Sequence, residues 1–244
     1  MSESFFKFRA WLIHLTTACG ALVALFGYYA ISQQNLKLAL MLMLLTIIID
    51  AIDGPLARFW KVKHYAPNYD GARLDYIVDF STWVLLPAFY ILNTQILMPA
   101  PWSIIASCMI VLSSCYQFCC IDLKAAESNF KRWPSAWSLM IILMAVWQSS
   151  AIFNFIIILA CCFFSFIPTS YFHPFQKNQF SNNPSRAAFL NFLVGFMAAL
   201  FLISMIVSIM LYPIANQLMI LIQQGVLVFY VICSLYNTYR EFNN

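Results

Sequence analysis

Residues 50–58 read DAIDGPLAR and residues 71–79 read GARLDYIVD, and these two segments set the organisation of the whole chain. They contain four of its nine acidic residues, which are Asp50, Asp53, Asp75 and Asp79. Both segments join long apolar runs. Carboxylates beside such runs are expensive to place in a membrane and mark functional positions by default.

The rest of the chain is very apolar. Of its 244 residues, 63% are hydrophobic and 9% are charged, and the mean hydropathy is +0.79. An ordinary soluble domain has about 25% charged residues, because a surface in water needs polar cover. The composition therefore excludes a soluble domain. The long, continuous apolar runs predict membrane-spanning helices.

Eight apolar runs divide the chain. We predict helices at residues 10–31, 36–54, 74–92, 99–121, 135–148, 151–170, 187–211 and 214–236. Residues 135–168 could instead form one helix, but its length of about 51 Å far exceeds a hydrocarbon core of about 30 Å. A reversal at Gln148, Ser149 and Ser150 would divide it into a hairpin. The sequence thus predicts an all-α, polytopic integral membrane bundle of eight transmembrane helices.

The basic residues predict how this bundle is oriented. With eight spans, all of the 13 Lys and Arg residues except Lys37 fall on the side that holds both termini. Cytoplasmic loops carry an excess of Lys and Arg, so we predict that both termini are cytoplasmic. With seven spans, Lys177, Arg186 and Arg240 would no longer lie on the same side as the other bases.

Helical spacing gathers the acidic side chains. At about 100° per residue, the polar and small residues of the first segment cover an arc of about 140°, at positions 50, 53, 54, 57 and 58. Positions 71, 75 and 79 cover an arc of about 80° on the next helix. The two helices run antiparallel through a short connection, so these faces can meet. Asp70 falls off the second face and is expected to be a loop residue.

This arrangement predicts a metal and phosphate site. Four carboxylates cannot all ionise near one another without cations, and a donor set made only of oxygen favours Mg²⁺ or Mn²⁺ over zinc. The small residues Gly54, Ala57 and Gly71 would let a bulky phosphorylated ligand approach the backbone. Arg58 could bind a phosphate through two hydrogen bonds.

Ion pairing within the connecting loop is the alternative interpretation. The same stretch contains four bases, which are Arg58, Lys61, Lys63 and Arg73. These bases cluster at the loop end, whereas Asp50 and Asp79 lie one to two turns deeper in their helices. Most of the bases are therefore out of easy reach of the deeper acids.

The pattern Asp-x2-Asp-Gly-x2-Ala-Arg, followed by Gly-x3-Asp-x3-Asp, resembles the signature of the CDP-alcohol phosphatidyltransferases. The segment between its two halves, residues 59–70, is longer than is usual in that family. This longer segment, together with Arg73-Leu74-Asp75 and the stretch from Tyr116 through Asp122 to Trp137, resembles the bacterial phosphatidylcholine synthases within the family. The resemblance covers most of residues 10–180.

The resemblance implies a single membrane-embedded domain over residues 1–244 that transfers the phosphatidyl group from CDP-diacylglycerol to choline, giving phosphatidylcholine and CMP. It implies two divalent ions, Mn²⁺ or Mg²⁺, bound by Asp50, Asp53, Asp75 and Asp79, with Asp79 also acting as general base. It implies CDP contacts from Gly54, Ala57, Arg58 and Gly71. It further implies a homodimer in the bacterial inner membrane, with the active site toward the cytoplasm and no nucleic-acid partner.

The acceptor site has its own candidates. Choline is a quaternary ammonium without an N–H donor, so its recognition uses aromatic faces and diffuse negative charge. The stretch that resembles the choline-using enzymes supplies Tyr116, Asp122 and Trp137, and Tyr76 is a further candidate because it adjoins Asp75. Candidate contacts for lipid phosphates are Lys61, Lys63 and Arg73, which serve the positive-inside rule equally well.

Three other functions fit parts of the pattern. Another family member would transfer to serine, inositol or glycerol phosphate, but an anionic acceptor calls for more bases than this site offers. A prenyltransferase with Asp-rich membrane motifs lacks the Gly-x2-Ala-Arg element. A divalent-cation transporter would need acids at mid-membrane, whereas Asp53, Asp75 and the loop bases predict a site near the cytoplasmic interface.

Overall fold

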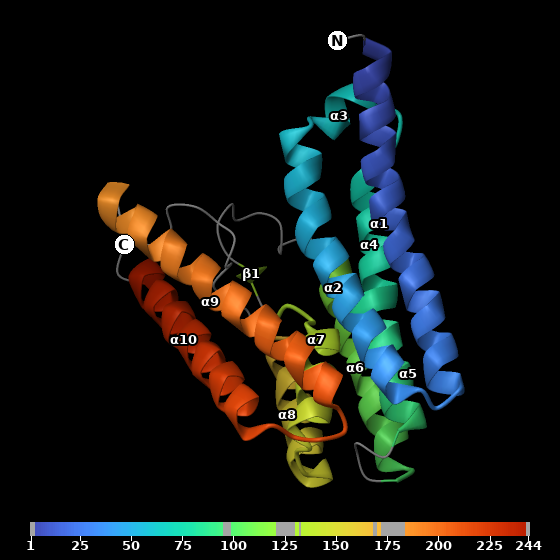
Figure 1. The fold of residues 1–244 in the computed structure, drawn as a ribbon, viewed down its shortest axis with the longest axis vertical. Coiled ribbons are helices and arrows are strands. Elements are labelled where there is room, and N and C mark those ends of the chain that lie inside the picture. Colours follow the sequence, from blue (N-terminus) through green and yellow to red (C-terminus); the bar gives the residue numbers. More distant parts are fainter. Residues whose placement is uncertain are drawn as a thin grey trace.

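The structure is a computed structural model that describes residues 3–94, 99–120, 130–131, 133–167, 170–171 and 184–242. Helices form almost all of it (Figure 1). In chain order they are α1 (Glu3–Ser32), α2 (Leu36–Phe59), α3 (Val62–Tyr65), α4 (Gly71–Asp79), the π-helix η1 (Phe80–Leu85), α5 (Leu86–Asn93), α6 (Trp102–Cys119), α7 (Trp137–Trp147), α8 (Ala151–Phe164), α9 (Pro184–Leu211) and α10 (Gln217–Phe242). A short antiparallel ladder pairs β1 (Phe130–Lys131) with β2 (Ser170–Tyr171). Apart from that ladder, the predicted all-α architecture is confirmed.

Successive long helices reverse direction along the chain. In Figure 1, α1 and α2 run side by side, and α4, η1 and α5 form one continuous helical segment beside them. The α9–α10 hairpin leans away from this group, and α9 contacts both α2 of the group and α7. The N-terminus and the end of α10 both face the half of the molecule that carries α3 (Figure 1).

The predicted reversal near residue 149 is confirmed, and one continuous helix over residues 135–168 is excluded. Helix α7 ends at Trp147, and Gln148 adopts a left-handed conformation with φ of 52°. Ser150 then caps α8, because its side chain accepts a hydrogen bond from the backbone N–H of Phe153 at 3.4 Å. A Ser at this position satisfies a backbone donor that the first helical turn leaves unpaired.

The number of spans is only partly confirmed. All eight predicted runs contain helix, and within the described residues five helical segments are long and apolar enough to cross a membrane: Glu3–Ser32, Gly71–Asn93, Trp102–Cys119, Ala188–Leu211 and Gln217–Leu235. Helix α2 is not among them, and α7 and α8 have only 11 and 14 residues. At 1.5 Å per residue these two are about 17 and 21 Å long, shorter than a hydrocarbon core of about 30 Å. Membrane crossing by α2, α7 and α8 therefore stays a prediction.

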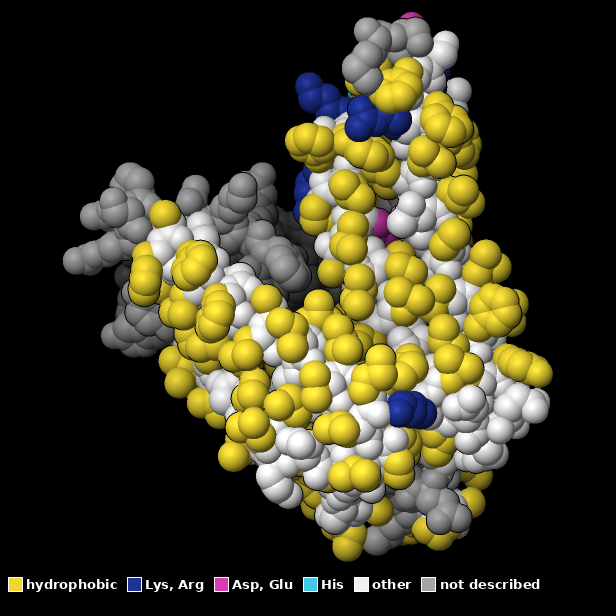
Figure 2. All heavy atoms as spheres, in the orientation of Figure 1, with side chains coloured by type: hydrophobic (Ala, Val, Ile, Leu, Met, Phe, Trp, Pro, Cys, Tyr) yellow, Lys and Arg dark blue, Asp and Glu magenta, His cyan; other side chains and the backbone are white. Residues whose placement is uncertain are grey.

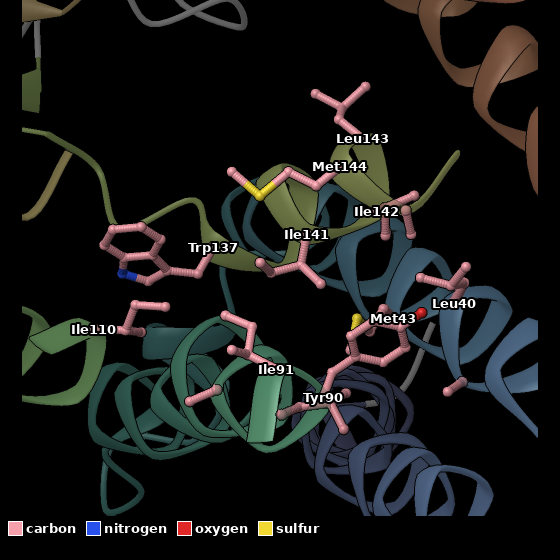
Figure 3. Close-up of a cluster of buried hydrophobic side chains, with 14 of the residues drawn as sticks. Leu40, Met43, Tyr90, Ile91, Ile110, Trp137, Ile141, Ile142, Leu143 and Met144 are labelled. Atoms are coloured by element: carbon pink, nitrogen blue, oxygen red, sulfur yellow. The ribbon is translucent and has the colours of Figure 1, made fainter. Parts of the chain in front are cut away.

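A buried apolar core joins helices from both halves of the chain (Figure 3). Trp137 and Ile141 of α7 point toward Ile110 of α6 and Ile91 of α5, while Met43 of α2 lies beside Tyr90. The side chain of Trp137 is fully buried, and its indole N–H donates to Ser114 Oγ at 2.8 Å. A buried indole needs such a partner, so this bond orients α7 against α6.

The face seen in Figure 2 is covered largely by hydrophobic side chains, with few charged ones among them. Large hydrophobic side chains such as Leu15, Leu25 and Phe26 of α1 are exposed, as helices facing lipid require. Basic side chains gather around the α3 end (Figure 2). Lys37, at the start of α2, lies at the opposite end, where its Nζ donates to the backbone carbonyl of Met210.

A reporter fusion tests the predicted orientation. The α7–α8 turn faces away from the α3 end, where the basic residues gather, so the positive-inside rule places it outside the cytoplasm. We expect an alkaline phosphatase reporter fused at Ser149 to be active and a green fluorescent protein fused there to be dark. The same pair fused after residue 66 should give the reverse result. A cytoplasmic Ser149 would contradict the eight-span topology.

Candidate active site

Three carboxylates meet between α2 and α4. Asp50 comes from α2, while Asp75 and Asp79 lie one turn apart on α4. One oxygen atom from each lies within 4.8 Å of the other two, and all three side chains are half-buried. The i, i+4 spacing on α4 and the antiparallel course of α2 therefore bring these acids together as the sequence predicted.

A change of helical winding follows Asp79 directly. Residues 80–85 form the π-helix η1, whose wider turns alter which side chains share a face. Buried donors from other helices accompany it: Ser138 Oγ donates to the carbonyl of Thr82, and Tyr28 Oη to that of Ser81 at 3.2 Å. The π segment also brings the Trp83 side chain within hydrogen-bonding reach of the Asp50 carboxylate.

Asp53 lies beside the group of three rather than within it. Its side chain is only 5% exposed, and its Oδ2 accepts a hydrogen bond from Thr17 Oγ1 of α1 at 2.7 Å. The spacing predicted that the faces carrying all four acids would meet. Instead, three share close oxygen contacts, and the fourth is held by α1.

Glycines let α1 approach the acid-bearing helix closely. A Cβ atom on Gly71 would lie 2.6 Å from His14 Cε1, and one on Gly20 would lie 2.9 Å from Val78 Cγ1. No real side chain tolerates such contacts without a shift of its neighbours. Gly71, expected to leave room for a ligand, thus also makes room for the buried ring of His14.

The remaining residues of the first segment differ in their surroundings. Gly54 has open space, since a Cβ atom there would meet only Arg58 Nη1 at 3.6 Å within 4 Å. Arg58 is exposed near the end of α2. Ala57 is half-buried and packs against the small cluster of Ala10, Ile13, Val62 and Ala66. Gly54 and Arg58 can therefore face a ligand, whereas Ala57 contributes to packing.

The loop bases do not pair with Asp50 or Asp53 in the part of the chain that the structure describes. Arg73 Nε instead lies 2.9 Å from Asp70 Oδ2, and Asp70 caps α4 by accepting from the Arg73 backbone N–H at 3.1 Å. Asp70 is thus a loop residue with a capping role, as expected from its position. Lys61 and Lys63 are exposed around α3.

The four choline candidates lie in different environments. The ring of Tyr76, half-buried, lies 6.3 Å from that of Phe118, and Phe118 also contacts Phe80. Tyr116 is 41% exposed and packs against Phe166. Trp137 has no exposed surface, so it belongs to the core described above. Asp122 lies outside the described residues.

The sequence of this region matches a known protein family. The family model for CDP-alcohol phosphatidyltransferase matches residues 13–167, which include all of the acids and small residues of the site. The chain belongs to the CDP-alcohol phosphatidyltransferase family. The match ends shortly after α8, so α9 and α10 lie beyond the family model.

Individual relatives match over most of the chain. It is 35% identical to the phosphatidylcholine synthase of Legionella pneumophila over 232 residues, covering 95% of this chain and 89% of the relative. It is 31% identical to that of Legionella bozemanae over 219 residues, covering 90% and 99%. It is 34% identical to that of Borreliella burgdorferi over 170 residues, covering 70% and 72%.

The donor set fits a hard divalent cation. Asp50, Asp75 and Asp79 offer only carboxylate oxygens from two helices, and their closeness would be strongly repulsive without a neutralising charge. Oxygen donors of this kind suit Mg²⁺ or Mn²⁺. Within the described residues, these three acids could hold a metal ion.

Sequence reasoning missed the contacts that depend on tertiary packing. The sequence did not predict the π-helix that carries Trp83, nor the contact of Trp83 with Asp50. It also assigned no role to His14, whose Nε2 is buried and has no hydrogen-bond partner among the residues that the structure describes. The three-residue spacing of His14 and Thr17, which places them on one face of α1, was the available signal.

Substitution of the clustered acids tests the metal site. We expect Asp50→Asn, Asp75→Asn and Asp79→Asn each to weaken Mn²⁺ binding by more than about tenfold, because each removes an anionic donor that the protein supplies. Titration of the purified protein with Mn²⁺, followed by electron paramagnetic resonance, measures the affinity. Asp70→Asn is the matched control, since Asp70 caps α4 and pairs with Arg73; it should bind Mn²⁺ as the unaltered protein does. Equal loss in all four variants would argue against a site at these three acids.

Proposed function

We propose that the chain is a phosphatidylcholine synthase, which transfers the phosphatidyl group of CDP-diacylglycerol to choline and releases CMP. The observation that carries this proposal is the meeting of Asp50, Asp75 and Asp79 at the family's motif positions. Relatives at 31–35% identity over most of the chain are phosphatidylcholine synthases, which favours choline as the acceptor.

The donor substrate is bound by the first segment, residues 50–58, and by the acids. Arg58 and the open backbone at Gly54 bind the diphosphate of the CDP group. Ala57 and Gly71, which the resemblance implies as further CDP contacts, pack against neighbouring residues of α1. Asp50, Asp53, Asp75 and Asp79 hold two divalent ions, Mn²⁺ or Mg²⁺. When bound, such ions neutralise phosphate oxygens and stabilise the charge that develops on the leaving CMP.

The transfer itself exchanges the phosphoanhydride bond of CDP-diacylglycerol for a phosphoester bond to choline. The choline hydroxyl oxygen bonds to the phosphorus that carries diacylglycerol, and the bond from that phosphorus to the CMP oxygen breaks. Asp79, the deepest acid of α4, accepts the hydroxyl proton. Most of the rate enhancement in such a reaction comes from positioning and charge stabilisation, which a rigid set of carboxylates on two helices provides.

Choline binds beside the acids in this proposal. Tyr76 and Asp79 share a face of α4 at i, i+3, and the ring of Tyr76 lies near Phe118, so an aromatic face and negative charge are available together for a quaternary ammonium. Tyr116 and Asp122 remain candidates from the sequence. Trp137 is left out, because its ring is enclosed in the core. Lys61, Lys63 and Arg73 are proposed contacts for lipid phosphates at the membrane surface.

The setting of the reaction follows from the charges. We place the protein in a bacterial inner membrane with the α3 end toward the cytoplasm, because basic side chains gather there. Residues 1–244 act as one domain, and two copies associate as a homodimer.

An assay with labelled acceptors tests the function. Purified protein in detergent, supplied with CDP-diacylglycerol and Mn²⁺, should convert labelled choline into labelled phosphatidylcholine with equimolar release of CMP. Labelled serine, inositol and glycerol phosphate run in parallel should give no lipid product. Label in phosphatidylserine or phosphatidylinositol, with none in phosphatidylcholine, would overturn the choice of acceptor.

The acceptor site is tested at Tyr76. We expect Tyr76→Leu to raise the KM for choline by about tenfold, because a desolvated cation–π contact contributes about 1–2 kcal/mol. The KM for CDP-diacylglycerol should stay within about twofold, since a free-energy change under about 0.4 kcal/mol is expected there. Tyr29→Leu, at an exposed position near the other end of α1, controls for the general effect of losing a tyrosine. An unchanged KM for choline in Tyr76→Leu would remove Tyr76 from the site.

A further inference from the structure

We propose that Thr17 is a positioning residue that orients Asp53 for the metal and nucleotide site. The inference rests on the proposed function only in so far as Asp53 serves that site. Thr17 itself contacts neither metal nor substrate in this proposal. It acts through the carboxylate of Asp53 and therefore through the geometry of the bound ion.

The contact is short, buried and made between different helices. Thr17 Oγ1 of α1 donates to Asp53 Oδ2 of α2 at 2.7 Å, and the two residues are 7% and 5% exposed. The same hydroxyl lies 3.4 Å from the carbonyl of Ile13 in its own helix. A hydroxyl has one proton, and a carboxylate is the stronger acceptor, so the proton is directed to Asp53.

Close packing on both sides fixes the position of Thr17. His14 lies three residues before it and fits into the space that Gly71 leaves open. Gly20 lies three residues after it and is pressed against Val78. Residues spaced by three share a face of a helix, so α1 cannot rotate or slide at Thr17 without clashing with α4. The hydroxyl is thereby aimed at Asp53 by the backbone.

Holding one carboxylate oxygen determines where the other can point. With Oδ2 held by Thr17, and with the carboxylate also accepting from the Gly54 backbone N–H, the direction in which Asp53 can face the neighbouring acids is restricted. Hydrogen-bond partners of metal-binding side chains have this role in many proteins, and their loss typically weakens metal affinity by about 10–100-fold. Thr17 would therefore affect the bound ion from a helix that carries none of the four acids.

Two substitutions separate the hydroxyl from the shape of the side chain. Thr17→Val keeps the branched shape and removes the donor, while Thr17→Ser keeps the donor. The matched control is Thr16→Val on the same helix, because Thr16 is exposed and its hydroxyl donates to Leu12 of its own helix at 2.9 Å. Each variant is compared with the unaltered full chain in detergent.

The measurement is Mn²⁺ affinity, determined by electron paramagnetic resonance in the presence of saturating CMP. We expect Thr17→Val to weaken Mn²⁺ binding by about tenfold, and Thr17→Ser and Thr16→Val to bind as the unaltered protein does. In turnover, Thr17→Val should need proportionally more Mn²⁺ for half-maximal activity. Thermal unfolding without metal identifies a variant that fails to fold. If Thr17→Val fails to fold, Thr17→Ala replaces it; weaker Mn²⁺ binding by Thr17→Ala than by Thr17→Ser then supports the role of the hydroxyl, and equal binding overturns it.

The outcomes distinguish this inference from the proposed function. Mn²⁺ affinity in Thr17→Val equal to that of the unaltered protein, or an equal loss in Thr16→Val, overturns the role of Thr17. Normal Mn²⁺ binding by the unaltered protein without any product from choline overturns the choice of acceptor and leaves the role of Thr17 standing. Failure of the unaltered protein to bind Mn²⁺ with CMP overturns the role of Thr17 outright.

Discussion

Mutual repulsion among carboxylates is the constraint around which this protein is built. Asp50, Asp75 and Asp79 approach within 4.8 Å in a chain with only 9% charged residues. Such a cluster opposes folding unless a counter-charge arrives and the scaffold resists separation. The scaffold does resist, because α2 and α4 are joined through α3 and both contact α1. Helix packing therefore holds the carboxylates together against their repulsion, and metal binding relieves that repulsion.

Helix α1 supplies much of that resistance through small residues. Association of helices in a membrane depends on close packing rather than on the hydrophobic effect, and glycines allow the closest approach. Gly20 against Val78 and Gly71 against His14 form such contacts, with the hydrogen bond from Thr17 to Asp53 between them. A helix without metal-binding acids thus sets the spacing of the two helices that carry them.

The sequence predicted the features that depend on helical periodicity and span length, but not the contacts that depend on how the helices pack. Spacing of 3.6 residues per turn correctly brought Asp50 together with Asp75 and Asp79, and span length correctly required a break near Ser149. The separate place of Asp53 could not be predicted, since it depends on a hydroxyl 36 residues away. The enclosure of Trp137 in the core had no local signal either, because an aromatic residue near a helix start is equally typical of a membrane interface.

The depth of the site follows from the same arrangement. Asp50 lies about two and a half turns before the end of α2, and Asp79 lies about two turns after the start of α4. In the proposed orientation the basic end meets water and headgroups, while exposed Leu and Phe side chains line α1 along its length, from Phe5 to Phe26. The proposed reaction needs both surroundings at once, since its donor carries acyl chains in lipid and its acceptor is a cation dissolved in water. A carboxylate cluster one to two turns below the interface can bind the headgroup of the donor while its acyl chains stay in the bilayer, and choline can then approach from the basic, hydrated end.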